Sequence, residues 1–90
     1  MNDQVFRLSK RAALESEGDE YVLVDTHSAS LCSCNATAWR LLTALTTGAT
    51  LEQLATELAD GFDIDAEIAH RDVLDFVGRL GAVGLIDDAA

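Results

Sequence analysis

The chain has 90 residues, 49% of them apolar, and its 16 acidic and 6 basic side chains give a formal net charge of -10. This length predicts a single domain over residues 1–90, with one core and no deep enclosed active site. The charge disfavours a nucleic acid partner, because phosphates repel an acidic surface, and the lack of a bilayer-length apolar run or a secretion signal predicts a cytoplasmic protein with no membrane partner.

The first third of the chain predicts three short strands. Residues 5–8 alternate weakly between apolar and polar side chains. Residues 21–25 are the clearest strand, since aromatic and aliphatic side chains are bounded by acids. Residues 30–34 follow a short turn and are expected to pair back as a hairpin partner. The stretch 16–20, which contains glycine and acids, is expected to be a loop.

Two helices are predicted next, each with a capping residue at its start. The side chain of Asn35 can accept a hydrogen bond from a free helical N–H, and Gly48 is expected to end this first helix. Thr50 and Gln53 form a capping-box pair that opens the second helix, which Gly61 is expected to end. Apolar side chains lie on one face of each helix at helical spacing. They are Ala38, Leu41, Leu42 and Leu45, then Leu51, Leu54, Ala55 and Leu58.

The third predicted helix runs from about residue 65 to residue 80. Gly81 and Gly84 are expected to end it, and residues 85–86 are expected to form a final extended piece that packs back on the helices. Apolar residues at helical spacing predict its core stripe. The stripe consists of Ala69, Val73, Phe76, Val77 and Leu80.

The opposite face of the third helix is a candidate contact surface. Arg71, Asp75 and Arg79 form i,i+4 pairs of opposite charge, which is typical of a solvated face. Leu74, however, is apolar, and Gly78 costs about 1 kcal/mol relative to Ala inside a helix. A glycine there flattens the surface and lets another backbone come close. The face is therefore either a salt-bridged surface or a binding surface.

No constellation of residues in the sequence predicts catalysis. Cys32 and Cys34 lie on one face of an extended strand, where a disulfide between them would be strained. We expect two free thiols, with a redox role as the alternative. His27 and His70 are isolated, and their spacing from the cysteines does not suit zinc. The sequence has no nucleophile–base arrangement, phosphate loop or metal motif, so we expect a non-enzymatic protein without metal or cofactor.

The order of these elements predicts an α+β, winged-helix-like domain, in which a small three-stranded antiparallel sheet is followed by a three-helix bundle. The characteristic segments are Tyr21 to Asp25, Asn35 to Ala38, Leu41 with Leu42 and Leu45, Gly48 to Ala55, and then Asp72, Val73, Phe76, Val77, Leu80 and Gly84 to Ile86. In their order and spacing the chain resembles the PqqD-like family, the recognition elements that bind leader peptides of ribosomally made natural products (RiPPs). The resemblance covers about residues 20–87. It departs at Cys34, where the family usually has Leu, and before Tyr21.

The resemblance implies how such a domain would bind its peptide. The leader would add as an antiparallel strand to the open edge of the sheet, in the groove between the third strand and the third helix. Arg71 and Arg79 would pair with leader carboxylates, and Leu74 would hold an apolar leader residue. The implied peptide-binding residues are Leu31, Cys32 and Ser33 on the strand, and Arg71, Leu74, Asp75, Gly78 and Arg79 on the helix.

The resemblance also implies the partners. They are a precursor peptide, through its leader, and a separate modifying enzyme such as a radical SAM enzyme, a cyclase or a leader protease. The natural product, the partner enzyme and the subfamily, whether quinone-cofactor, lasso-peptide or another type, are left open by the sequence. The alternative is an acidic winged-helix regulator acting through protein or DNA contacts. Its third helix would carry two Arg against two Asp, whereas DNA readers present a basic face.

Overall fold

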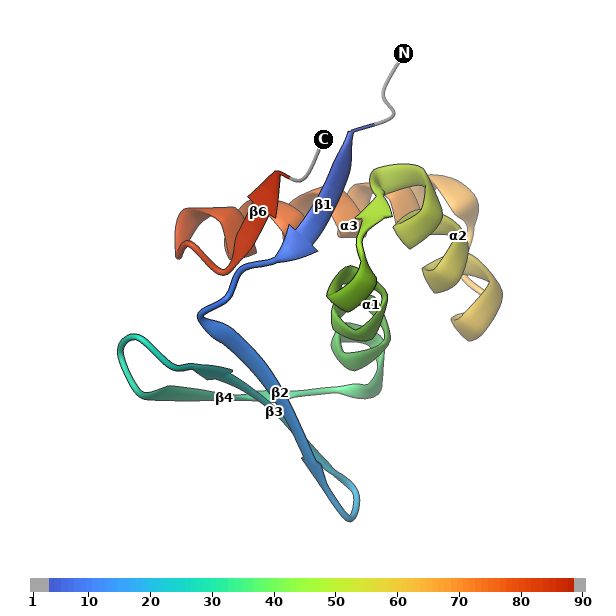
Figure 1. The fold of residues 1–90 in the computed structure, drawn as a ribbon. Helices are drawn as coiled ribbons and strands as arrows, with labels where there is room; N and C mark the ends of the chain where they lie inside the picture. The colour runs from blue at the N-terminus through green and yellow to red at the C-terminus, as the bar shows by residue number, and fades with distance from the viewer. Residues whose placement is uncertain (1–3, 89–90) are drawn as a thin grey trace.

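The computed structural model describes residues 4–88, which form three helices and two small antiparallel sheets of three strands each (Figure 1). The predicted α+β class, with short strands preceding three helices, is confirmed, while the grouping of the strands differs from the prediction. The elements in chain order are β1 (Val5–Leu8), β2 (Ala12–Glu17), β3 (Glu20–Asp25), β4 (Ser30–Cys34), α1 (Ala36–Thr47), β5 (Ala49–Thr50), α2 (Leu51–Phe62), α3 (Ala66–Ala82) and β6 (Ile86–Asp88).

The first sheet has the strand order β2–β3–β4. The predicted hairpin between β3 and β4 is confirmed, with Leu23 opposite Cys32 and Asp25 opposite Ser30. The strand β2, however, was missed, and the predicted loop at 16–20 is narrower because Glu17 already pairs with Glu20. Small and acidic residues give β2 a weak strand pattern, and pairing with β3 overrides it.

The second sheet joins distant parts of the chain in the order β5–β1–β6. The strand β1 therefore does not extend the hairpin sheet, as the sequence had suggested, but pairs with β5 on one side and β6 on the other. The predicted final extended piece is confirmed as β6, where Ile86 pairs with Leu8. The buried Ser9 after β1 is held to the turn between α3 and β6, since its Oγ donates to the Gly84 carbonyl at 3.1 Å.

Local capping sets the start of α1 and of α2, as predicted. The N–H of Ala38 donates to Oδ1 of Asn35 at 2.8 Å, and the capping box between Thr50 and Gln53 is complete. Gly61, in contrast, does not end α2, which continues to Phe62. A Cβ at position 61 would lie only 2.9 Å from the Arg40 side chain, so this glycine makes room for that arginine.

The helix α3 begins at its Asp65 cap and passes through Gly81 to Ala82, slightly beyond the predicted end. The core stripe is confirmed at Ala69, Val73, Val77 and Leu80, which are all buried. Phe76 was predicted as a full core residue, but it is only half-buried and packs at the margin of the core. It lines the groove between α3 and β4 and also the adjoining hollow between α3 and α1.

Leucines from α1 and α2 fill the centre of the core together with the buried stripe of α3. The helix α1 contacts β1 of one sheet and β4 of the other, so it links the two sheets. The described residues contain no helix long and apolar enough to cross a membrane. The largest fully buried side chains are Leu42, Leu45, Leu54, Leu58 and Val73.

Candidate functional site

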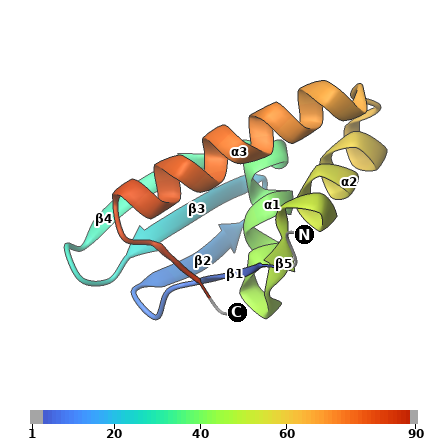
Figure 2. The ribbon, with the colours of Figure 1, turned by 90° about the horizontal axis from the view of Figure 1, so that it is seen from above.

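The strand β4 has one paired edge and one open edge. It is the last strand of the β2–β3–β4 sheet, and no other strand among residues 4–88 pairs with its outer side. Such an edge presents backbone N–H and C=O groups that can template a further strand. The helix α3 runs beside this edge (Figure 2), so an added strand would lie between β4 and the helix.

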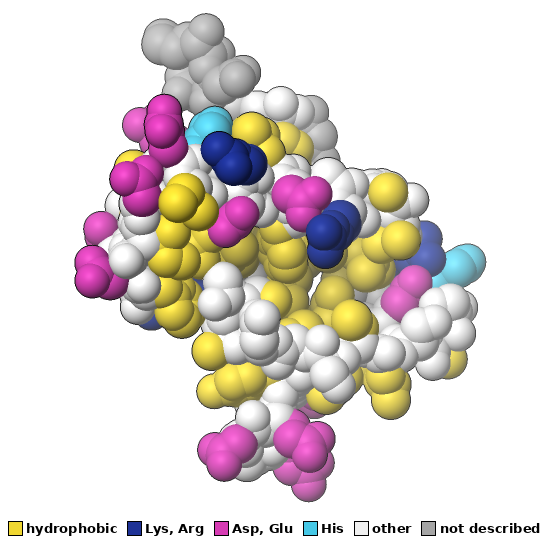
Figure 3. Space-filling model, turned by 180° about the vertical axis from the view of Figure 1, so that it is seen from behind, with side chains coloured by type: hydrophobic (Ala, Val, Ile, Leu, Met, Phe, Trp, Pro, Cys, Tyr) yellow, Lys and Arg dark blue, Asp and Glu magenta, His cyan; other side chains and the backbone are white. Residues whose placement is uncertain are grey.

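A groove of about 730 Å³ lies between this strand and the second half of α3. The space-filling view from behind shows it as a hollow with hydrophobic side chains inside and charged side chains around its margin (Figure 3). Ligand sites are typically concave and mostly apolar, with a few polar groups. The groove is lined by Arg11, Leu23, Asp25, Ser28, Ser30, Cys32, Ser33, Cys34, Ala38, Leu42, Phe76, Arg79, Leu80, Val83 and Leu85.

The floor of the groove is an extension of the hydrophobic core. Leu23 and Leu80 are buried and also line the groove, while Phe76 is half-buried beside them. Val83 at the end of α3 is 56% exposed. An apolar surface left uncovered in this way, with polar groups around it, marks an interaction site.

One end of the groove is polar and is held by an ion pair. The Nε and Nη2 atoms of Arg11 donate to the two carboxylate oxygens of Asp25 at 3.2 and 2.8 Å. These hydrogen bonds hold the pKa of Asp25 well below its usual range, and the backbone N–H of His27 adds a further bond. Next to the pair, the hydroxyls of Ser28 and Ser30 share a hydrogen bond of 2.8 Å.

Three of the residues predicted to bind peptide line this groove. Cys32, Ser33 and Arg79 are all part of its wall. Asp75 lies in the adjoining hollow between α1 and α3, where its carboxylate pairs with Arg79 at 2.9 Å. Leu31 is on β4 but is 73% exposed, and the alternation of a strand turns its side chain to the face opposite that of Cys32.

The structure does not bring the other three predicted residues into the groove. Arg71, Leu74 and Gly78 are exposed on the side of α3 that faces away from the core. A Cβ at Gly78 would meet no atom within 4 Å, so open space surrounds this glycine. The sequence correctly identified this glycine as unconstrained by the core, but the groove runs along another flank. A role for these three residues in binding stays a prediction.

Several groove residues were not predicted to bind peptide, the chief ones being Arg11, Asp25, Phe76 and Val83. Phe76, Arg79 and Val83 are spaced by three and four residues, which places them on one flank of α3 beside the core stripe. This spacing is visible in the sequence. The Arg11–Asp25 pair depends on the pairing of β2 with β3, which the sequence did not indicate.

The two cysteines are free and differ in their surroundings. Cys32 is exposed in the groove, whereas burial raises the pKa of the Cys34 thiol. Their sulfur atoms lie 3.7 and 3.6 Å from backbone carbonyl oxygens. Within residues 4–88, no group of three or more His, Cys, Asp or Glu side chains is placed to hold a metal ion.

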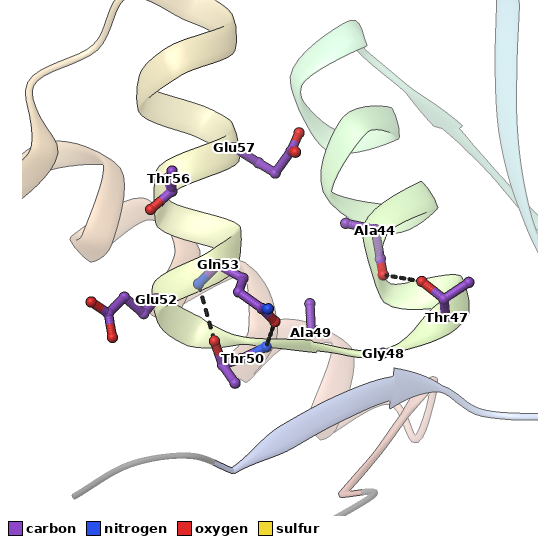
Figure 4. A pocket seen from close by; sticks show the side chains of 9 residues that line it. All are labelled: Ala44, Thr47, Gly48, Ala49, Thr50, Glu52, Gln53, Thr56 and Glu57. Atoms are coloured by element: carbon purple, nitrogen blue, oxygen red, sulfur yellow. Dashed lines mark hydrogen bonds between the residues drawn. The ribbon is translucent and has the colours of Figure 1, made fainter.

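A second hollow lies between the end of α1 and the start of α2 (Figure 4). Its polar side chains largely serve the local structure, because Thr50 and Gln53 bond each other's backbone and Thr47 bonds the Ala44 carbonyl. Glu57 at its margin forms an ion pair with Arg40, whose Nε lies 2.8 Å from Oε2 of the carboxylate. These groups are already paired within the fold, so the groove beside β4 is the better candidate site.

Comparison with known proteins gives a matching family and similar solved structures, two of which are described here. The family model of "Coenzyme PQQ synthesis protein D (PqqD)" matches residues 20–86. The structure titled "TbiB1 in Complex with the TbiA(beta) Leader Peptide" is 21% identical, with a TM-score of 0.80 over 93% of this chain and 98% of that one. "Lasso peptide synthetase B1 complexed with the leader peptide" is 24% identical, with a TM-score of 0.78 over 91% and 96%. No curated protein sequence matched.

Proposed function

The chain belongs to the PqqD family, and from this premise we propose that it binds the leader segment of a ribosomally synthesised precursor peptide by strand addition. It then presents the precursor to a separate modifying enzyme in natural-product biosynthesis. The observation that carries this proposal is the open edge of β4 beside an apolar groove under α3. The two proteins of similar fold were both solved with leader peptides, which supports the same class of ligand here.

Strand addition suits the geometry of this edge. Main-chain hydrogen bonds to β4 give affinity for an extended peptide largely independent of its sequence, while alternate side chains enter the groove and give selectivity. In an antiparallel addition, leader residues opposite Cys34, Cys32 and Ser30 would point toward α3. The leader residues that alternate with these would point to the opposite face of the sheet, which carries Leu31.

The apolar groove supplies the binding energy that an isolated extended strand lacks. A leader side chain over Phe76, Leu80 and Val83 would remove both its own apolar surface and that of the groove from water. At about 25 cal/mol per Å² of apolar surface, covering roughly 100–200 Å² gives about 2.5–5 kcal/mol before the cost of ordering the peptide is subtracted. The expected affinity is therefore that of a moderately tight peptide complex.

The protein acts in this proposal as a non-catalytic adaptor. Its groove is lined by hydroxyls, thiols and the Arg11–Asp25 ion pair. These groups do not form the nucleophile–base arrangement that acyl or group transfer needs. The modifying enzyme, of the radical SAM, cyclase or leader protease type, would act on the core of the precursor while the leader is held. We place the protein in the cytoplasm.

Calorimetric titration tests the proposal directly. A synthetic peptide spanning the leader of the precursor encoded beside this gene should bind with a stoichiometry of one. A scrambled peptide of the same composition is the control for charge and hydrophobicity. If the leader binds no better than the scrambled peptide, the proposed function is wrong.

A further inference from the structure

Charge is distributed differently in the groove from elsewhere in the chain. The sequence has 6 basic and 16 acidic residues, yet the groove is lined by two arginines, Arg11 and Arg79, and by only one acid, Asp25. Asp25 is already neutralised by Arg11. Arg79 in turn is paired with Asp75. The groove is therefore close to neutral on an acidic protein, and a preference for a charged ligand depends on the hydrogen-bond donors that these pairs leave free.

The Arg11 guanidinium is held in place by Asp25 and still has N–H groups that can donate to a ligand. Its Nε and Nη2 atoms donate hydrogen bonds to Asp25. Its Nη1 atom makes no hydrogen bond within the described part of the chain and lies beside Gly84. A Cβ on Gly84 would come within 3.1 Å of Nη1. The Arg11 side chain is 37% exposed, so a ligand can reach it. A planar guanidinium with two free N–H groups suits a carboxylate.

The register of the sheet places this donor at one position along β4. Asp25 pairs with Ser30, whereas Leu23 pairs with Cys32. A leader residue opposite Cys32 would thus lie over the apolar floor, and the residue opposite Ser30 would reach the Arg11–Asp25 end. These two positions are two residues apart, and both side chains point into the groove.

Resting on the proposed strand addition, we infer that the groove selects an acidic leader residue, Asp or Glu, two positions C-terminal to a bulky apolar one. Antiparallel addition to β4 sets this direction, because the added chain runs from the level of Cys34 toward that of Ser30. The acidic side chain is bound by the N–H groups of Nη1 of Arg11, which Asp25 does not use.

A basic leader residue is disfavoured at the same position. Asp25 already accepts bonds from Arg11 and from the N–H of His27, so it has little acceptor capacity left for a lysine. A lysine would also approach the guanidinium, a like charge. The net charge of -10 repels an acidic peptide at long range, but this repulsion is screened beyond about 8 Å at physiological salt, whereas a direct contact is not.

Selection from a random peptide display library tests the inference without requiring the precursor itself. The baits are the parent protein, Arg11→Gln, and Arg7→Gln as a matched control, since Arg7 lies in the other sheet and donates to the Thr47 carbonyl. The parent and the Arg7→Gln variant should enrich bulky apolar residues followed two positions later by Asp or Glu. The Arg11→Gln variant should keep the apolar preference and lose the acidic one.

A binding titration then measures how much the contact between Arg11 and the acidic peptide residue adds to the affinity. The parent should bind a selected Glu peptide about tenfold more tightly than the same peptide with Gln, and Arg11→Gln should reduce this ratio to about one. The double variant Arg11→Gln with Asp25→Asn should behave in the same way, and it avoids leaving Asp25 without its partner.

The outcomes separate the two proposals. If apolar peptides are enriched without an acidic residue, or if the acidic preference survives in Arg11→Gln or disappears in Arg79→Gln alone, the assignment to Arg11 is wrong while strand addition stands. If the parent enriches no apolar extended peptide at all, the proposed function itself fails.

Discussion

Two flanks of α3 carry apolar side chains, but only one of them is fully buried within the fold. On the flank toward the other helices, Ala69 and Val73 are fully buried. On the flank toward β4, Phe76 is half-buried and Val83 is 56% exposed, and both line the groove. The first flank has nothing further to gain from a ligand, whereas the second has apolar surface that a ligand can cover. We therefore expect one helix to serve both stability and recognition.

The same substitution on the two flanks gives the largest contrast. Val73→Asp places an unpaired carboxylate in the core and should cost more than about 4 kcal/mol, enough to unfold much of the protein. Val83→Asp should cost only about 1 kcal/mol, chiefly because an acid is unfavourable at a helix C-terminus. It should nevertheless weaken leader binding markedly. Chemical denaturation and calorimetry measure the two effects, and equal destabilisation would contradict the division of the helix.

Phe76 is on the flank toward β4 but also packs against the core, so its substitution should show both effects. Phe76→Ala is expected to cost about 1–2 kcal/mol of stability, less than the 3–5 kcal/mol of a fully buried Phe. Leader affinity should fall at least tenfold, because the ring lines the groove. Thermal unfolding and titration of the same variant separate the two losses. A large loss of stability without a loss of affinity would assign Phe76 to the core alone.

Gly78 tests the outward side of α3, which belongs to neither flank. A Cβ there meets open space, so Gly78→Ala should stabilise the helix by up to about 1 kcal/mol. Leader affinity should stay within about twofold of the parent if the groove alone binds the peptide. A clear loss of affinity, with the expected gain in melting temperature, would instead support the binding surface that the sequence suggested around Leu74 and Gly78.

The cysteines give the smallest expected effect and report on occupancy of the groove. Cys32 is exposed, whereas burial raises the pKa of the Cys34 thiol, so an alkylating reagent at neutral pH should modify Cys32 first. Saturating leader peptide should slow this reaction by covering the groove. Mass spectrometry of the time course gives both rates. Unchanged modification of Cys32 in the complex would place the peptide elsewhere.

Much of the fold could be predicted because its signals are local. Asn35 and the Thr50–Gln53 box mark helix starts within four residues, and the β3–β4 hairpin joins neighbouring segments. The strand β2 and the second sheet could not be predicted in this way. Ala12–Glu17 has little strand preference of its own, and the partners of β1 lie at residues 49–50 and 86–88.

The candidate site was predicted in its elements but only partly in its residues. The groove between the third strand of the hairpin sheet and α3 is present, with Cys32, Ser33 and Arg79 in its wall. Phe76 and Gly78 are only two residues apart, yet about 200° apart around the helix. Helical spacing separates the faces of α3, but only the tertiary arrangement shows which flank borders β4.

Strand addition between β4 and α3 can be observed by NMR of the labelled protein with unlabelled leader peptide. We expect intermolecular contacts between peptide protons and the backbone of β4, and slowed amide exchange along Ser30–Cys34. Methyl contacts to Val83 and Leu80 should accompany them, while the opposite edge of the sheet, β2, stays unchanged. Contacts centred on Leu74 and Gly78, or peptide pairing with β2, would contradict binding of the leader as a strand between β4 and α3.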